Sequence, residues 1–186
     1  MVEATVRSIV VQAISVLLLC ALIEVSAGSV LGGMENSFKI LPGLMVMVPP
    51  LLALRGNISG ALASRLGTAL HGGVIEPPFL ANPELRVNIL SSIFLTFLVS
   101  LSVGVLSFLV SVSAGIEHIT IWSFILIALI SGLLSNFIMV ALTVSIALGT
   151  FIHGWDPDNI TSPIVATVGD FLTVLCIFIA VLLVGV

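Results

Sequence analysis

Residues 163–186 read PIVATVGDFLTVLCIFIAVLLVGV, and this stretch decides the class of fold. It is apolar almost throughout, and Asp170 is its one carboxylate. A transmembrane α-helix needs about 20 consecutive, mostly apolar residues. The stretch therefore predicts a helix that crosses a membrane at the C-terminal end of the chain.

The composition of the remaining chain extends this prediction to the whole molecule. Of the 186 residues, 59% are hydrophobic and only 8% are charged, which is more apolar surface than a soluble domain of this length can bury. The net charge of −4 is small, and no basic cluster points to nucleic acid or to an anchor on anionic lipid. We expect an integral membrane protein.

Apolar segments of membrane-spanning length occur along the entire sequence. Because backbone groups inside a bilayer must be satisfied internally, such segments are expected to be helical. We therefore predict an all-α, polytopic membrane protein with five transmembrane helices in one domain, residues 1–186. The expected spans are approximately 9–31, 40–70, 87–113, 119–151 and 163–186.

The first span has an alternative interpretation as a secretory leader. Arg7 followed by an apolar run to Cys20 has the form of a signal peptide. The apolar run continues to Leu31, however, which favours a transmembrane helix. Cys20 and Cys176 both lie in apolar runs, and we interpret them as small hydrophobic residues.

The second span is too long for a simple crossing, so it is tilted, broken or extends beyond the bilayer. Pro49-Pro50 is the expected break point, because proline donates no backbone hydrogen bond. Small residues recur at every fourth position beyond the break. Such a stripe lets helices approach closely, either within the chain or between copies, and it also suits a pore lining. Its members are Gly56, Gly60, Ser64, Thr68 and Gly72.

Three polar side chains in this span need partners. Asn57 lies one position from the small-residue stripe, and its amide can bond another helix or line a polar conduit. Arg65 is close enough to the end of the span to reach the membrane surface. Arg55 lies deeper, and Glu24 in the first span is a candidate carboxylate partner for it.

Asp170 is the leading candidate for a functional residue. A carboxylate at the centre of a bilayer costs roughly 2.5–3.5 kcal/mol on insertion scales, and such residues usually mark an ion path or a partner. With Ala166, Thr167 and Thr173 near the same helix face, it forms an oxygen-rich site suited to Mg²⁺ or Ca²⁺. The alternatives are an ion pair with Arg55 that only fixes packing, and a proton-coupling role.

The remaining polar residues are weaker candidates. Glu24 is functional, is an ion-pair partner, or extends its side chain outward to the membrane surface. Asp156 and Asp158 either collect cations or belong to a solvated loop or helix cap. The three histidines are scattered at the ends of spans, without metal-ligand spacing. No nucleophile–base pair, phosphate loop or cofactor motif is present, so we expect neither an enzyme nor a bound cofactor.

Orientation follows from basic residues near the ends of the spans. With the N-terminus in the cytoplasm, Arg7, Arg65 and Arg86 lie on the cytoplasmic side and Lys39 lies outside. Five spans then place the C-terminus outside a cell membrane. The charge bias is small, so parallel and antiparallel arrangements of two copies both stay open.

Two motifs together resemble the MgtE-type divalent-cation transporters, and they are most similar to the eukaryotic solute-carrier branch of that family. One is PLLALRGN at residues 50–57 with LASRL at residues 62–66, and the other is DPDN at residues 156–159 with the Gly169-Asp170 pair. The resemblance extends over essentially the whole chain and implies a five-helix transmembrane domain.

The resemblance also implies a site and a partner. It implies that the domain dimerises and that the second and fifth helices of both copies line the pore. It further implies that Asp170 holds a hydrated Mg²⁺ with the Ala166 carbonyl, and that Asn57 lies along the pore. The cytoplasmic sensor domains of bacterial relatives have no counterpart in this sequence, so their gating is not expected here.

Taken together, these features predict a homodimeric magnesium or divalent-cation channel in a lipid bilayer. A Na⁺- or H⁺-coupled exchanger is the alternative within transport, and a non-transporting assembly subunit is the alternative outside it. The sequence leaves open the ion selectivity, the direction of transport and the role of Arg55.

Overall fold

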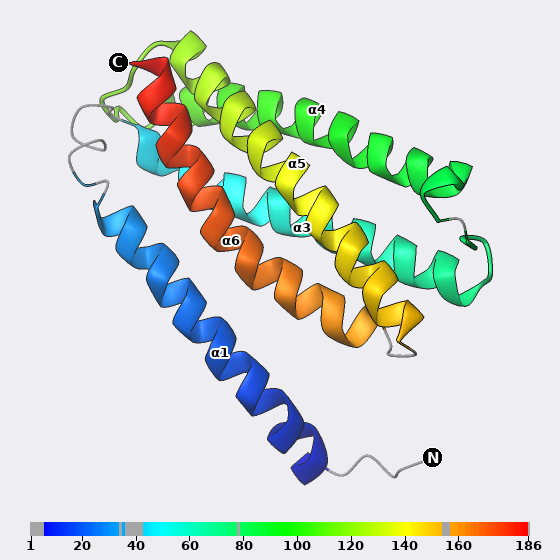
Figure 1. Ribbon diagram of the computed structural model, residues 1–186. Helices are drawn as coiled ribbons and strands as arrows, with labels where there is room; N and C mark the ends of the chain where they lie inside the picture. The colour runs from blue at the N-terminus through cyan, green and yellow to red at the C-terminus, as the bar shows by residue number, and fades with distance from the viewer. Residues whose placement is uncertain (1–5, 34, 36–42, 78, 154–156, 186) are drawn as a thin grey trace.

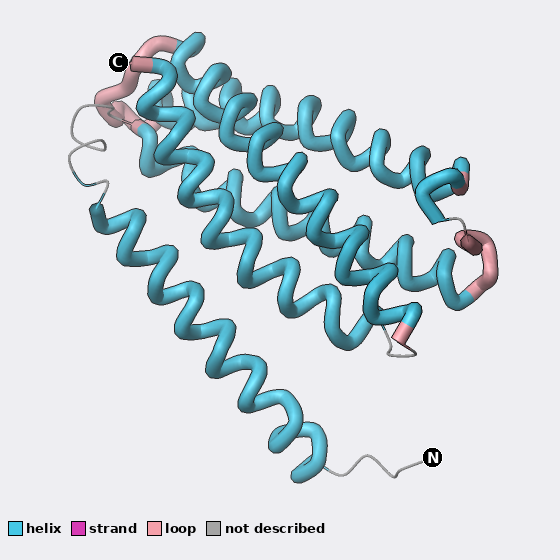
Figure 2. The backbone as a smooth tube through the Cα atoms, in the orientation of Figure 1, coloured by secondary structure: helices cyan, strands magenta, loops and turns pink. Residues whose placement is uncertain are grey.

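The computed structural model describes residues 6–33, 35, 43–77, 79–153 and 157–185, and these residues form a bundle of long α-helices (Figures 1 and 2). No strand occurs among them, which confirms the all-α prediction. The elements are α1 (Val6–Gly33), α3 (Leu44–His71), the short 3₁₀ helix η1 (Phe79–Ala81), α4 (Pro83–Ser113), α5 (Ile121–Ile152) and α6 (Pro157–Val184).

Four of these helices are long and apolar enough to cross a membrane. They are α3, α4, α5 and the Ile164–Val184 part of α6. In α1 (Val6–Gly33), the apolar stretch found among the described residues is Leu18–Gly33, which is shorter than a membrane span. The multi-pass prediction is therefore confirmed, whereas a fifth crossing through α1 stays a prediction.

Helix α3 packs against α4, α5 and α6. Helix α5 lies between α4 and α6 and contacts both, and α1 lies along α6 at the edge of the bundle (Figure 1). The first residue of α1 and the last residue of α6 lie at opposite ends of the molecule (Figure 1). This arrangement brings α3 and α6, which are distant in the sequence, into direct contact.

The apolar core has two parts, one toward each end of the bundle. The first surrounds Phe124 of α5 and includes Met47 of α3 and Ile177 of α6, all fully buried. The second surrounds Leu62 and Leu66 of α3. Burial of large side chains in both parts holds α3 in place on either side of its middle turns, where the charged side chain Arg55 lies.

Pro49 and Pro50 do not break the second span, so that prediction was wrong. Both prolines lie inside α3, which is continuous from Leu44 to His71. They stand five and six residues after the first residue of the helix, so only the first turn loses hydrogen bonds to them. The buried side chains of Met47, Val48 and Leu51 keep this end of the helix packed despite that loss.

Close helix packing occurs at glycines other than those of the small-residue stripe. A side chain at Gly104 of α4 would meet the backbone of Ile125 at 2.8 Å, and one at Gly132 of α5 would overlap Ser100. At Gly56 and Gly60, in contrast, an added Cβ would meet nothing within 4 Å. The stripe on α3 therefore faces out of this chain, and the close contact is between α4 and α5.

Helix α4 and helix α6 begin earlier than their expected spans. Pro83 occupies the first turn of α4, and the Asn82 side chain caps it by accepting hydrogen bonds from the backbone N–H groups of Glu84 at 2.9 Å and Leu85 at 3.4 Å. Helix α6 begins at Pro157, a favourable first helical residue, and continues through Pro163. The helix thus extends six residues before the span expected from residue 163, and the part long and apolar enough to cross a membrane, Ile164–Val184, agrees with that expected span.

Candidate functional site

An ion pair joins the two helices predicted to carry the site. Arg55 of α3 donates a hydrogen bond from Nη2 to Oδ1 of Asp170 on α6, with 2.5 Å between the two atoms. The two side chains are unequally exposed, 5% for Arg55 and 35% for Asp170. The alternative in which Asp170 pairs with Arg55 is therefore the observed contact, and Glu24 is not the partner of Arg55.

The same guanidinium also binds two backbone carbonyls of α6. Nη1 of Arg55 donates to the Val165 oxygen at 3.2 Å, and Nη2 donates to the Ala166 oxygen at 3.1 Å. Residues 166 and 170 are one helical turn apart, so the carbonyl and the carboxylate lie on one side of α6. Arg55 thus fills a small cluster of three oxygens, two of which were expected to bind a cation.

Gly169 makes room for this arrangement. A Cβ built on Gly169 would overlap the Nη1 atom of Arg55 and crowd Cζ. A larger residue at this position would displace the guanidinium from α6. The absence of a side chain at Gly169 is therefore as necessary for this contact as the two charged side chains are.

The predicted threonine ligands lie inside the bundle. Thr167 and Thr173 are buried, and Thr173 donates a hydrogen bond from its hydroxyl to the Gly169 carbonyl at 2.8 Å. Ala166 and half-exposed Asp170 lie toward the outside. The five expected oxygen donors are therefore not gathered in one place, and only Asp170 and the Ala166 carbonyl lie together.

Asn57 and the secondary acidic candidates lie away from the ion pair. Asn57 is exposed, only two residues after buried Arg55, and so belongs to another face of α3. Glu24 is exposed on α1. Asp158 is in the first turn of α6, where its side chain is not described, and Asp156 lies outside the described residues.

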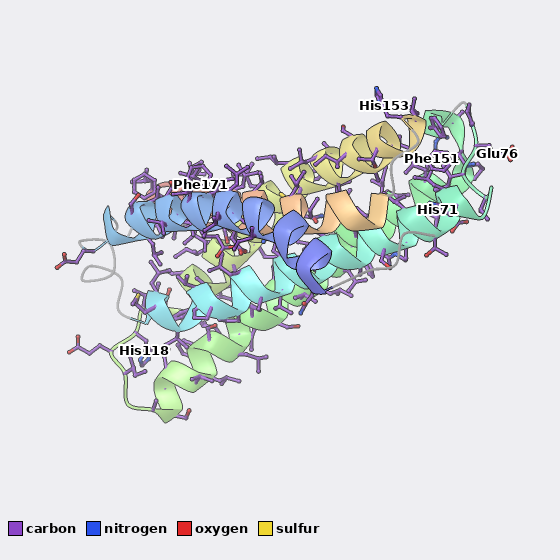
Figure 3. The ribbon with its side chains drawn as sticks, turned by 90° about the horizontal axis from the view of Figure 1, so that it is seen from below. His71, Glu76, His118, Phe151, His153 and Phe171 are labelled. Carbon is purple, nitrogen blue, oxygen red and sulfur yellow. The ribbon has the colours of Figure 1, made fainter. Side chains whose placement is uncertain are left out.

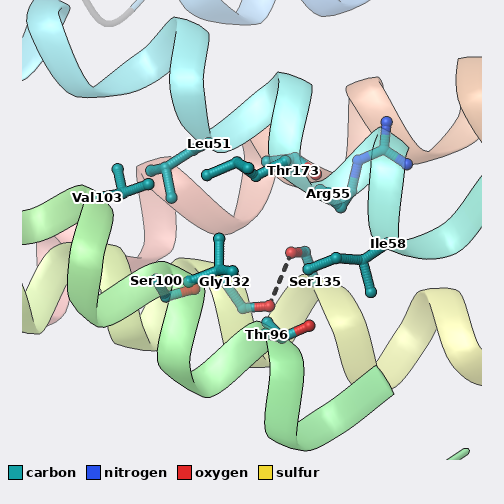
Figure 4. Close-up of a pocket in the computed structure, with 11 residues that line it drawn as sticks. Leu51, Arg55, Ile58, Thr96, Ser100, Val103, Gly132, Ser135 and Thr173 are labelled. Atoms are coloured by element: carbon teal, nitrogen blue, oxygen red, sulfur yellow. Dashed lines mark hydrogen bonds between the residues drawn. The ribbon is translucent and has the colours of Figure 1, made fainter. Parts of the chain in front are cut away.

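A small cavity lies beside Arg55, where α3, α4, α5 and α6 meet (Figure 4). Its volume of about 20 Å³ is enough for about one water-sized molecule. Figure 4 shows Arg55 and Thr173 across from Thr96, Ser100 and Ser135, so the polar lining consists of hydroxyl groups and the arginine. The Nε atom of Arg55 is buried and has no hydrogen-bond partner within the described part of the chain.

The histidines do not form a metal centre with one another. His71 and His153 lie near one end of the bundle, where the His71 ring packs edge-on against Phe151 at 6.0 Å, and His118 lies at the other end (Figure 3). Across the described ranges, no group of three or more histidine, cysteine or acidic side chains could hold a metal ion. An ion at the Asp170 site would therefore depend on backbone oxygens and on water.

The Val165 carbonyl had no role in the sequence prediction, and Gly169 entered it only as part of a family motif. The local signal for the space that Gly169 provides was a glycine directly before the lone carboxylate of an apolar span. The pairing itself joins residues 115 positions apart, so no local pattern contains it.

The fold and this site together define a multi-pass, α-helical membrane protein with a charged, oxygen-rich site where two of its helices meet. Comparison with known proteins gives the family. The MgtE family model, described as "Divalent cation transporter", matches residues 48–180, and the chain belongs to that family. The match contains both halves of the ion pair.

Curated relatives support the solute-carrier resemblance. The chain is 32% identical to Solute carrier family 41 member 2 of Xenopus laevis over 182 residues, which cover 92% of this chain and 32% of the relative. It is 33% identical to Solute carrier family 41 member 3 of Mus musculus over 143 residues, covering 73% of this chain and 28% of the relative. The chain thus spans about a third of the length of these relatives.

Proposed function

We propose that this chain moves Mg²⁺, or divalent cations more broadly, across a membrane along a path bordered by α3 and α6 of two copies. Asp170 is the principal ion ligand in this proposal, and the Ala166 carbonyl supports it. Asn57, Thr167 and Thr173 contribute indirectly, because the first lies on another face and the other two are buried. The family of the chain supports a divalent cation as the transported ion.

One observation carries the proposal: a partly exposed carboxylate lies within a membrane-spanning helix, next to backbone oxygens. Oδ1 of Asp170 is bound by Arg55, while Oδ2 has no hydrogen-bond partner among the described residues. Mg²⁺ prefers oxygen ligands and keeps several of its waters, so one carboxylate per chain is enough to hold a hydrated ion. Carboxylates within membrane-spanning helices mark ion paths or pair with an opposite charge, and Asp170 has both a paired oxygen and a partly exposed side chain.

In this proposal, a second copy of the chain packs against α3 and encloses the ion path. The exposed stripe of small residues on α3 suits close packing against another helix of the membrane. A homodimer across α3 would bring two Asp170 carboxylates and two Asn57 amides toward a common path. We include α1 as the fifth crossing, with the N-terminus in the cytoplasm and the C-terminus outside.

Uptake of Mg²⁺ into proteoliposomes that contain only this chain tests the proposal. Wild type should take up Mg²⁺ faster than empty liposomes, and Asp170→Asn should abolish the uptake at equal incorporation. Glu117→Gln is the matched control, because it removes a carboxylate from the exposed segment between α4 and α5. Equal uptake by wild type and Asp170→Asn would move the ion site elsewhere, with Glu24 the next residue to test.

The same preparation distinguishes the alternative functions. Uptake that follows the membrane potential alone indicates a channel, whereas dependence on an imposed Na⁺ or H⁺ gradient indicates a coupled exchanger. No uptake above empty liposomes under any of these gradients would favour a non-transporting assembly subunit.

A further inference from the structure

We propose that Arg55 is a tethered cation that competes with the divalent ion for the oxygens of Asp170 and Ala166. The inference rests on the proposed function and assigns Arg55 a place in it. Ion binding and release then become an exchange of one cation for another at a single site. The arginine sets how tightly the ion is held and keeps the site neutral between ions.

The guanidinium already occupies the position that a bound ion needs. Arg55 binds Oδ1 of Asp170 and the carbonyls of Val165 and Ala166, all within 3.2 Å. A divalent ion that used Oδ1 and the Ala166 oxygen would meet a positive charge at hydrogen-bonding distance. Like charges at that separation repel strongly wherever water is scarce, so the ion and the guanidinium exclude each other.

The site is constructed so that an ion can approach while Arg55 is still bound. Arg55 reaches the cluster from the buried side, with its side chain 5% exposed, and Asp170 is 35% exposed on the other side. Oδ2 of Asp170 lacks a hydrogen-bond partner among the described residues and is the first oxygen available to an incoming ion. The Asp170 carboxylate can thus exchange Arg55 for the divalent ion without being left unpaired at any stage.

The displaced guanidinium has polar groups on its inner side. The cavity beside Arg55 is lined by the hydroxyls of Thr96, Ser100, Ser135 and Thr173 (Figure 4). Hydroxyl oxygens accept hydrogen bonds from a guanidinium. A shift of the side chain toward these hydroxyls would bring its N–H groups nearer to acceptors, and the cavity itself has room for about one water-sized molecule.

A purely structural ion pair predicts a different response to mutation. If Arg55 only fastened α3 to α6, its removal would loosen the site and weaken ion binding. If Arg55 competes with the ion, its removal strengthens binding. The sign of the change in Mg²⁺ affinity therefore separates the two roles.

Calorimetric titration of the purified full chain with Mg²⁺ measures that sign. We expect Arg55→Gln to bind Mg²⁺ at least about tenfold more tightly than wild type, since a single charge contact of this kind easily exceeds the free energy of a tenfold change. Arg65→Gln is the matched control, because Arg65 is on the same helix but exposed, and its affinity should equal wild type. Arg55→Gln that binds Mg²⁺ equally or more weakly while folded would overturn the proposal.

A second variant tests the same idea with both charges kept. Gly169→Ala introduces a methyl group that overlaps the guanidinium and displaces it from α6, so Mg²⁺ should again bind more tightly. Gly149→Ala is its control, because a Cβ there meets nothing within 4 Å. Weaker binding by folded Gly169→Ala would contradict competition even if Arg55→Gln failed to fold.

The proposed function and this inference fail in different ways. If Asp170→Asn transports Mg²⁺ as wild type does, the ion site is wrong, and the competition at that site is wrong with it. If transport requires Asp170 but neither Arg55→Gln nor Gly169→Ala raises the affinity, the function stands and the inference is overturned.

Discussion

Arg55 and Asp170 depend on their ion pair to different degrees. The arginine side chain is 5% exposed, and the aspartate side chain is 35% exposed. A buried charge without a partner is destabilising by several kcal/mol, whereas a partly exposed carboxylate can be hydrated when its partner is removed. The contact is therefore more important for keeping the arginine buried than for keeping the carboxylate charged.

This asymmetry predicts unequal losses of stability. Asp170→Asn should lower the free energy of unfolding by about 2–3 kcal/mol, because it leaves a buried guanidinium with carbonyl partners but no counter-charge. Arg55→Gln should lower it by about 1 kcal/mol or less, because in the proposed ion path water reaches the remaining carboxylate. Unfolding titrations in mixed detergent measure both values, and a larger loss for Arg55→Gln would contradict the argument.

At the scale of the helices, the sequence predicted those features that depend on residues close together in the chain. It did not predict those that depend on contacts between helices. The apolar runs of α3, α4, α5 and α6 follow from composition and were predicted. Whether Pro49 and Pro50 break α3 depends on where that helix begins and on the burial around it, and here the prediction was wrong. Likewise, the spacing of Gly56 and Gly60 predicted a helix face of small side chains. It did not predict that Gly104 and Gly132 make the close contacts within this chain.

The contact between α4 and α5 gives a test at this scale. Gly104→Ala should destabilise the protein by about 1–3 kcal/mol, because the new Cβ meets backbone atoms of Ile125 that cannot rotate away. Gly132→Ala should be milder, since it meets the Ser100 side chain, and Gly149→Ala should be neutral or slightly stabilising. Thermal unfolding in one detergent ranks the three variants, and equal losses at residues 104 and 149 would rule out a tight contact.

The start of α4 depends on a single side chain with two functions. Asn82 accepts hydrogen bonds from the first turn of α4 and donates one to the Val74 carbonyl at 3.0 Å. Asn82→Ala should therefore cost about 1–2 kcal/mol of stability, and Asn82→Asp, which keeps the cap but not the donor, should cost less. Thermal unfolding compares the two variants, and equal losses would mean that the bond to Val74 dominates.

At the scale of the whole molecule, the sequence predicted the class of protein and its family better than it predicted which residues contact each other at the site. The membrane class, the family and the importance of Asp170 as a candidate followed from one apolar stretch and two motifs. The partner of Arg55 did not follow, because Asp170 lies 115 residues away and Glu24 was an equally permissible carboxylate. Long-range pairing of this kind is fixed by the packing of α3 on α6, which no local pattern encodes.

The small-residue stripe of α3 is the part of the molecule whose role a second copy would explain. Ser64 and Thr68 are exposed on it, and in a dimer formed across α3 the corresponding residues of two copies approach each other. With Cys20 and Cys176 replaced, Ser64→Cys or Thr68→Cys should give disulfide-linked dimers in membranes under mild oxidation. A disulfide requires Cα atoms within about 7 Å, so Ser102→Cys, on the exposed face of α4, should stay monomeric. Crosslinking at residue 102 and not at residues 64 or 68 would place the dimer on α4, and the ion path would then have to be sought away from α3.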